Sequence, residues 1–215
     1  HLTGETTIQN CTIQDFYYDS GSDTGYAFRF APNAVINTRS PYIQNCSVIT
    51  KGTPITVTAG ATFSVQTQEN KPRGITFNND GTKMFIVGEQ GDDVNEYTLS
   101  VGFDLSSTVT FIDSFPVTQC PNPTAVKFNA DGTKMFVTGT SNSNVHQYAL
   151  TTGFDVSTAS FTQTKVITVD NDMFGLDFKP DGTKMYLTGN QNDKIYEFNL
   201  SSAFDISTAT FVQDV

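Results

Sequence analysis

Residues 80–85 read DGTKMF, and the same phrase returns at residues 131–136 and, with one change, as DGTKMY at residues 181–186. The copies begin 51 and then 50 residues apart. A fixed period of this size is typical of repeat architectures, in which each repeat is one supersecondary unit. The phrase therefore predicts the architecture of a whole segment rather than a single site.

The similarity extends far beyond the phrase, to units that begin at Pro72, Pro123 and Met173. Within each unit, short runs rich in β-branched and aromatic residues alternate with clusters of turn residues, which predicts four β-strands per unit. In the first unit we expect these strands at Gly74–Phe77, Met84–Val87, Val94–Leu99 and Thr108–Phe115.

An Asp-Gly pair separates the first two expected strands of each unit. Such a pair suits a tight hairpin, because glycine takes positive φ at no steric cost and aspartate bonds its own local backbone. The Thr and Lys that follow resume the strand, with the lysine charge expected in solvent. The predicted structural turn residues are Asp80, Gly81, Asp131, Gly132, Asp181 and Gly182. A second turn is expected to be capped by the side chains of Asp104, Asp155 and Asp205.

Burial is predicted to differ between the strands of a unit. Met84–Val87 is apolar at successive positions, so both of its faces must be covered. The third strand alternates better and the fourth is the most polar. Four antiparallel strands with a buried middle are typical of a propeller blade stacked between neighbours. We therefore predict an all-β fold of β-propeller-type repeats, with three four-stranded blades of about 50 residues; a solenoid is the alternative.

The repeats resemble the family of β-propeller repeats whose blades carry a DGTK turn between their first two strands, over residues 61–215. The resemblance implies the fold but not an activity, because propellers support many unrelated activities. The expected domain spans residues 59–215, with blades at about 61–118, 119–168 and 169–215.

The blade count predicts assembly. Residues 61–70 (ATFSVQTQEN) match the fourth-strand segments at Val109 and Ala209, so we expect a lone fourth strand before three full units. Propellers typically have four to eight blades, so three blades do not close a ring. An unpaired edge invites strand addition from another chain. We therefore expect either a longer array or self-assembly with this or other structural chains.

Residues 1–58 do not match the three repeats. They contain a shorter repeat of their own, which we call the echo: TIQNCTI at Thr7 and YIQNCSV at Tyr42. The echo predicts stacked rungs of a parallel β-helix-like segment, with Cys11 near Cys46 in its interior. The loop between the echoes is expected to be a rung insertion, with an exposed binding loop as the alternative. Two rungs are too few for independent stability, so we expect a fragment or a docking element.

The stretch TGYAFRFAPNAVINTRSPYIQNCSVITKGT, residues 24–53, resembles a segment of the tail-fibre and baseplate-associated structural proteins of tailed phages that infect aquatic bacteria, cyanobacteria in particular. The likeness covers about the first 53 residues. The resemblance implies a surface role in a virion.

Composition excludes several classes of partner. The formal net charge is −10 and the pI is about 4.4, so no nucleic-acid partner is expected. The sequence contains no run of 18 apolar residues, so no membrane span is predicted. The three cysteines lack a CxxC spacing, which favours buried free thiols over a zinc site or a disulfide framework.

The sequence offers little catalytic chemistry, and no enzyme is predicted. There is no HExxH, GxSxG or P-loop motif. His146 is interpreted as an exposed strand residue at the position held by Glu96 and Glu197 in the other units. Glycoside cleavage needs a carboxylate pair, and the candidates Asp15, Asp19 and Asp23 cannot be paired from sequence.

The loops between second and third strands are the predicted recognition sites, because they are rich in oxygen ligands. No cofactor is predicted, with Ca²⁺ at these loops as the alternative, although EF-hand spacing is absent. The predicted residues are Gln90, Asp92, Asp93, Asn142, Asn144, Gln191, Asn192 and Asp193.

The sequence is compatible with three functions. The leading hypothesis is a non-enzymatic structural and adhesive protein, a virion tail-fibre or baseplate-like component or an extracellular fibre subunit, whose loops recognise a cell-surface receptor or glycan. The second is a carbohydrate- or cation-binding propeller module. The third is a glycan-cleaving, tailspike-like enzyme on the β-helix part.

Overall fold

The computed structural model describes residues 8–9, 12–13, 43–44, 47–48 and 60–212, and the chain divides into two units, residues 1–59 and 60–215. In the first unit, β1 (Ile8–Gln9) pairs with β3 (Ile43–Gln44), and β2 (Thr12–Ile13) pairs with β4 (Ser47–Val48). Both pairs are parallel, and Ile8 lies opposite Ile43. This register aligns the two copies of the echo. Cys11, Cys46, Asp15, Asp19, Asp23 and the loop between the echoes lie outside the described residues.

The second unit confirms the predicted fold class, because it contains three four-stranded antiparallel sheets, one per repeat. Blade 1 consists of β5 (Pro72–Phe77), β6 (Lys83–Gly88), β7 (Asp93–Leu99) and β8 (Val109–Pro116). Blade 2 consists of β9 (Pro123–Phe128), β10 (Lys134–Gly139), β11 (Val145–Leu150) and β12 (Ala159–Lys165). Blade 3 consists of β13 (Met173–Phe178), β14 (Lys184–Gly189), β15 (Lys194–Leu200) and β16 (Ala209–Phe211).

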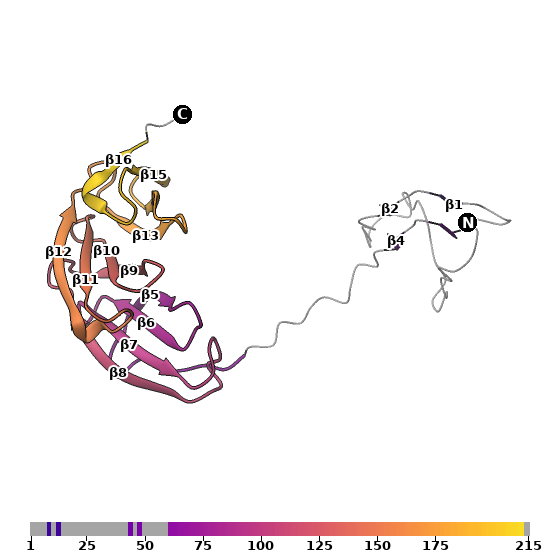
Figure 1. The fold of residues 1–215 in the computed structure, drawn as a ribbon, viewed down its shortest axis with the longest axis horizontal. Helices are drawn as coiled ribbons and strands as arrows, with labels where there is room; N and C mark the ends of the chain where they lie inside the picture. The colour runs from indigo at the N-terminus through magenta and orange to yellow at the C-terminus, as the bar shows by residue number, and fades with distance from the viewer. Residues whose placement is uncertain (1–7, 10–11, 14–42, 45–46, 49–59, 213–215) are drawn as a thin grey trace, which may run out of the picture. The chain divides into compact units, whose positions relative to one another are not determined.

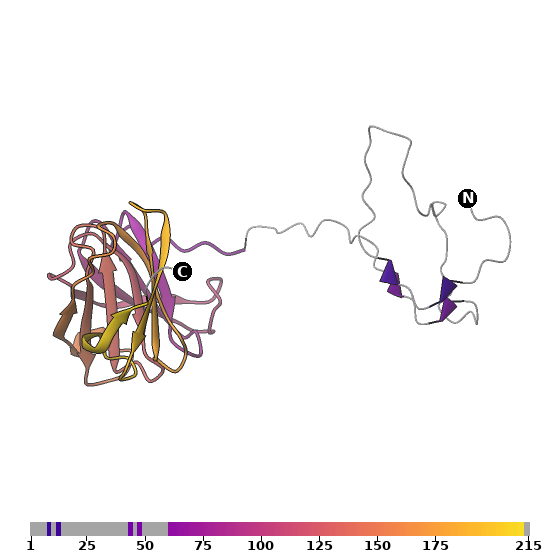
Figure 2. The ribbon, with the colours of Figure 1, turned by 90° about the horizontal axis from the view of Figure 1, so that it is seen from above.

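The blades follow one another around an arc, with the first strands on its inner side and the fourth strands β8 and β12 on its outer side (Figure 1). Single 3-10 turns, η1 (Val156–Thr158) and η2 (Ile206–Thr208), precede the fourth strands of blades 2 and 3. When the arc is turned by 90°, the strands of the three blades are seen to be roughly aligned with one axis (Figure 2). The connecting loops therefore gather at the two ends of the strands.

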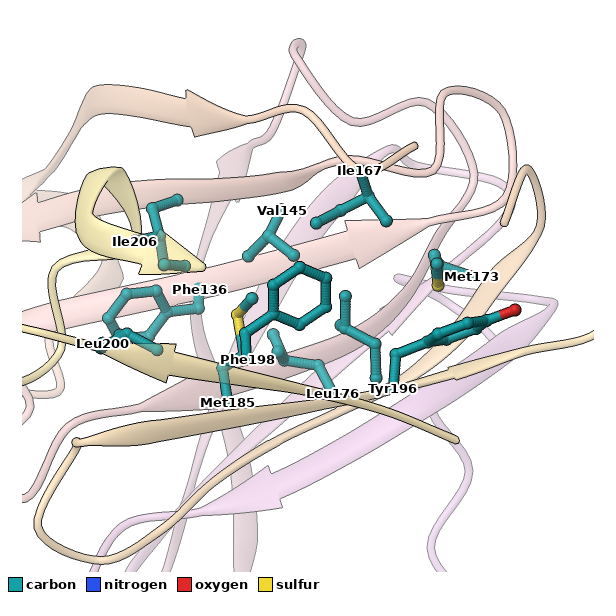
Figure 3. Close-up of a cluster of buried hydrophobic side chains, with 12 residues drawn as sticks. Phe136, Val145, Ile167, Met173, Leu176, Met185, Tyr196, Phe198, Leu200 and Ile206 are labelled. Atoms are coloured by element: carbon teal, nitrogen blue, oxygen red, sulfur yellow. The ribbon is translucent and has the colours of Figure 1, made fainter. Parts of the chain in front are cut away.

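Two cores lie between neighbouring blades, which is why the middle strands read as continuous apolar runs. Phe85, Val87 and Val94 of blade 1 pack with Met135 and Val137 of blade 2. An equivalent cluster joins blades 2 and 3 (Figure 3). The fourth strands are largely exposed, as their polarity predicts. Burial of apolar area between sheets contributes about 25 cal/mol per Å², so each blade is stabilised mainly by its neighbours.

The DG turn is wider than the expected tight hairpin. Gly81 has φ +73° and its N–H donates to the Asn78 carbonyl at 3.1 Å, while the Asn78 N–H donates to the Lys83 carbonyl. Asp80 Oδ1 accepts from the Thr82 N–H at 3.0 Å. The loop widens because the Asn78 side chain also accepts from the Lys83 N–H, at 2.9 Å. Gly132 and Gly182 have φ +72° and +73°.

The lone fourth strand expected at residues 61–70 is wrong. These residues form irregular backbone and one turn, because no earlier sheet in the described chain offers them a strand to pair with. Phe63 nevertheless stands edge-on to Tyr97, with ring centroids 5.7 Å apart, as Phe115 at the end of β8 stands to Tyr148 at 5.6 Å. The segment therefore takes the place of the end of a preceding fourth strand.

Among the residues that the structure describes, no helix has the length and apolarity needed to cross a membrane.

Candidate functional site

The two kinds of predicted site residue lie at opposite ends of the strands. The DGTK turns and the FD phrases connect strands at one end, and the predicted recognition loops connect β6 to β7, β10 to β11 and β14 to β15 at the other.

The phenylalanine of each FD phrase adopts an unusual backbone conformation. Phe103, Phe154 and Phe204 have φ values of 59°, 58° and 52°, a left-handed region that is strained for a bulky residue. Each ring packs on the glycine of its own DG turn, where an added Cβ would overlap the ring. The Phe103 N–H donates to the Gly81 carbonyl at 3.0 Å. The two turns thus pack against each other through the phenylalanine ring and this hydrogen bond.

The aspartates of the FD phrases hold this conformation. The Oδ1 atom of each aspartate accepts a hydrogen bond from the backbone N–H two residues later, at 2.8 to 3.1 Å. Asp155 and Asp205 are also the N-caps of η1 and η2. Hydrogen bonds from Ser106 lower the pKa of Asp104.

The main-chain carbonyl of the FD phenylalanine in blade 2 is bound by the preceding blade, blade 1. Lys83 Nζ donates to the Phe154 carbonyl at 2.6 Å and to Glu96 Oε1 at 2.7 Å, and Glu96 Oε2 accepts from the Val156 N–H at 2.9 Å. Glu96 is 1% exposed, so its charge requires these partners. We call this set of four residues the inter-blade clamp. It corrects the expectation that the lysine charge lies in solvent.

The clamp is repeated between blades 2 and 3. Lys134 Nζ donates to the Phe204 carbonyl at 2.9 Å, and Gln147 Oε1 accepts from the Ile206 N–H at 3.3 Å. In blade 3 the equivalent residues Lys184 and Glu197 form an ion pair with each other, and their side chains are 35% and 33% exposed. The hydrogen bond with Glu197 raises the pKa of Lys184.

Aromatic rings accompany the clamp. Phe85 lies 4.5 Å from Phe128 and 6.3 Å from Phe154 of blade 2, between ring centroids. Phe136 makes the same two contacts, at 4.5 and 6.3 Å, with Phe178 and Phe204 of blade 3. Sequence reasoning missed this arrangement. Its signal was the regular separation between each DGTK lysine and the FD phrase of the following blade, 71 residues for Lys83 and Phe154 and 70 for Lys134 and Phe204.

At the other end, most predicted recognition residues have structural roles. Asp92 Oδ1 accepts from the Asn122 N–H at 2.8 Å, and Asp93 Oδ1 accepts from Asn95 Nδ2 at 2.7 Å. Burial raises the pKa of Asp93. Asn70 Nδ2 donates to Gln90 Oε1 at 3.3 Å.

The same holds in the other two blades. Asn142 Nδ2 donates to the Gln119 carbonyl at 2.7 Å, and Asn144 Oδ1 accepts from the Ile167 N–H at 3.2 Å. Asn192 Nδ2 donates to the Val169 carbonyl at 3.1 Å. Gln191 and Asp193 are exposed. Within the described chain, no group of three His, Cys, Asp or Glu side chains is placed to hold a metal ion.

His146 corrects a further expectation, because it is 2% exposed rather than on the surface. It lies opposite Val137 on β10, as Asn95 lies opposite Ile86 on β6, so Gln147 is the counterpart of Glu96. The sequence alignment of this strand was therefore one residue out, which exchanges the two faces of a strand. His146 Nδ1 lies 2.9 Å from Thr164 Oγ1, and burial lowers the pKa of His146 to about 4.

Sequence reasoning also missed a groove at the inner strands, with a cavity volume of about 280 Å³. It is crossed by an ion pair between Lys127 Nζ of blade 2 and Asp177 Oδ1 of blade 3, 3.4 Å apart. Thr76, Lys127 and Asp177 occupy equivalent positions in the three blades, each one residue before the phenylalanine that ends the first strand. The remaining lining residues are Phe77, Asn79, Phe128, Asn129, Ala130, Phe154, Phe178, Lys179, Pro180 and Phe204.

A second hollow, of about 250 Å³, lies on the face of blade 1 that points away from blade 2, and it is apolar. Ile75 is 54% exposed there, beside Met84, Ile86 and Leu105. Met84 and Ile86 are themselves only 2% and 5% exposed, and their counterparts in blade 2, Met135 and Val137, pack against blade 1. The hollow is therefore the blade 1 surface that a preceding blade would cover.

The three stacked sheets of the described residues define a protein with β-propeller-type blades. No protein-family model and no curated protein sequence matches the chain. Similar solved structures include a candidate 6-phosphogluconolactonase from Bacteroides fragilis, with 14% identity over 66% of this chain and a TM-score of 0.48. A periplasmic gluconolactonase from Pseudomonas aeruginosa has 17% identity over 66% of this chain, and a β-propeller domain from Myceliophteria thermophila has 11% over 66%, each with a TM-score of 0.45.

The chain spans only 37%, 40% and 42% of the length of these three structures. At these identities and TM-scores, the similarities carry no argument about activity. The propeller-type architecture stands on the three sheets and their stacking.

Proposed function

We propose that the chain is a non-enzymatic structural and adhesive protein whose propeller blades present a polar groove to a surface glycan. The observation that carries this proposal is the lining of the inner groove, where polar side chains from three blades surround aromatic rings. Small-molecule sites are typically concave and apolar, with a few polar groups that fix orientation. A volume of about 280 Å³ suits one or two sugar units at the end of a chain.

Variation between the repeats supports a recognition role for this groove. The phenylalanines Phe77, Phe128 and Phe178 are the same in every blade and pack beside the FD rings. The adjacent lining positions instead carry Thr76, Lys127 and Asp177. A position that differs in each blade is not required to build the blade, so these side chains are available for a ligand.

The lining favours binding over cleavage. Hydrolysis of a glycosidic bond normally uses two carboxyl groups about 5 to 9.5 Å apart. Among the described residues that line the groove, Asp177 is the single carboxylate, and it pairs with Lys127. We place the protein in a virion tail fibre, a baseplate-like component or an extracellular fibre, on the resemblance of its first 53 residues to phage structural proteins.

Binding to a printed array of bacterial surface oligosaccharides tests the glycan part. We expect the wild-type chain to retain at least one oligosaccharide, and Lys127→Ala and Asp177→Ala to weaken that binding about tenfold, as expected for a lost charged hydrogen bond worth ~1.5 kcal/mol. Lys71→Ala, at an exposed lysine of blade 1 outside the groove, is the control and should bind as wild type. Absence of any bound glycan, or equal binding by all variants, would contradict the proposal.

A further inference from the structure

Blade 3 ends in half of an inter-blade clamp. Lys184 and Glu197 hold the positions of Lys83 and Glu96. They are a third exposed, whereas Glu96, which is bound to blade 2, is buried. Tyr186 occupies the position of Phe85 and is partly exposed. This surface therefore has the residues of a clamp but meets no further blade among the residues that the structure describes.

Blade 1 begins with the other half. Phe103 has the same left-handed backbone as Phe154, with φ 59° against 58°, yet its side chain is 62% exposed. Its ring lies 5.3 Å from Phe77, as Phe154 lies 5.4 Å from Phe128. In blade 2 that aromatic pair receives Phe85 of the preceding blade. In blade 1 the pair receives no ring from a preceding blade within the described residues.

We propose that these two surfaces bind each other in a head-to-tail dimer of this chain. Lys184 of one copy donates to the Phe103 carbonyl of the second copy, and Glu197 accepts from the backbone N–H of Leu105. The Tyr186 ring enters between Phe77 and Phe103. The same contact covers the apolar hollow of blade 1.

The occupant is a second copy because both halves of the clamp are already present on this chain. The three residues that blade 1 uses to bind the FD phrase of blade 2 recur in blade 3, with one change from Phe to Tyr, and the FD phrase of blade 1 has the conformation of the phrase that is bound. Lys184 and Glu197 neutralise each other, so docking leaves no unpaired charge in the interface. Ile195, 73% exposed on β15, would also be covered, since its counterpart Val94 is buried against blade 2.

The number of copies follows from the number of blades. A head-to-tail contact forms a closed ring if its rotation closes and a filament if it does not. Closed propellers typically have four to eight blades. With the three blades that the structure describes, two copies give six blades, whereas one or three copies fall outside that range. This inference goes beyond the proposed function: of the residues that it uses, Phe77 alone also lines the glycan groove.

Light scattering after size-exclusion chromatography tests the dimer, with an expected mass of twice the 23.5 kDa chain. Glu197→Arg should disable the blade 3 surface and Leu105→Asp the blade 1 surface, so each variant alone should run as a monomer. Thr110→Arg, on the exposed outer strand β8, is the control and should remain a dimer. Circular dichroism confirms that each variant is folded.

Mixing the two disabled variants is the decisive step. Each variant retains the surface that the other lacks, so an equimolar mixture should recover the dimer mass through one intact interface. A wild-type monomer, a dimer that survives both substitutions, or a mixture that stays monomeric would overturn the proposal. The oligosaccharide array, run on the same proteins, separates the two claims: glycan binding by a monomeric wild type would refute the dimer alone, and a dimer that binds no glycan would refute recognition alone.

Discussion

The ammonium group of Lys83 in blade 1 donates a hydrogen bond of 2.6 Å to the main-chain carbonyl of Phe154 in blade 2. The same ammonium neutralises Glu96, which in turn accepts from the Val156 N–H. One lysine therefore links a repeated turn, a buried carboxylate and the next blade. The repeated DGTK phrase both forms a hairpin and supplies the cation that joins the blades.

Replacement of Lys83 should therefore be costly. We expect Lys83→Met to lower the free energy of unfolding by about 3 kcal/mol, because Glu96 remains buried without its cation. Urea unfolding followed by circular dichroism measures the loss. Lys71→Met is the matched control and should change stability by less than about 1 kcal/mol, since Lys71 makes an exposed pair with Glu89. In Lys83→Met, the additional change Glu96→Gln should restore part of the loss.

The DG turn gives a second prediction, because Gly81 has both a positive φ and no room for a Cβ. We expect Gly81→Ala to destabilise the protein by about 2 to 4 kcal/mol, from left-handed strain and from overlap with the Phe103 ring. Gly60→Ala, at a glycine with open space around it, should lie within about 0.5 kcal/mol of wild type. Thermal unfolding of the two variants distinguishes them, and equal melting temperatures would refute the assigned packing.

Much of the fold could be predicted from sequence because its determinants are local. Apolar runs such as Met84–Val87 and the DG pairs fix strand and turn within a few residues, and repetition shows that each unit is the same. The contact between Lys83 and Phe154 could not be predicted in this way, since it joins residues 71 positions apart and depends on how blades stack. His146 shows a third case, in which a slip of one residue reversed the face assigned to the side chain.

Burial of His146 predicts a pH dependence of stability. Its pKa is lowered from 6.5 to about 4 in the folded protein, so the unfolded chain binds the proton more readily between these values. Stability is therefore fully present above pH 6.5 and is lost as the pH falls toward 4, by up to about 3 kcal/mol. Urea unfolding at pH 7 and pH 4.5 measures the loss. His146→Asn, which restores the Asn95 residue type of blade 1, should flatten the dependence; an unchanged slope would show that other groups cause it.

Cys120 should be inert in the folded protein. Its thiol is 0% exposed, and burial raises its pKa to about 12, so neither access nor thiolate is available. Alkylation with iodoacetamide, followed by peptide mass spectrometry to isolate Cys120 from Cys11 and Cys46, should show labelling only after denaturation in urea. Rapid labelling of Cys120 in the native protein would contradict its place in the core between blades 1 and 2.

Phe103 and Phe154 offer a comparison of one residue in two environments. The two have the same backbone conformation and pack on the same kind of glycine, but Phe154 also receives Phe85 from the preceding blade. We expect Phe154→Ala to cost about 3 to 4 kcal/mol and Phe103→Ala, at a side chain 62% exposed, only about 1 kcal/mol. Unfolding of dilute, monomeric protein measures this difference. If a second copy covers Phe103, the stability loss of Phe103→Ala should approach that of Phe154→Ala as the protein concentration rises. Dimer formation then stabilises wild type more than Phe103→Ala.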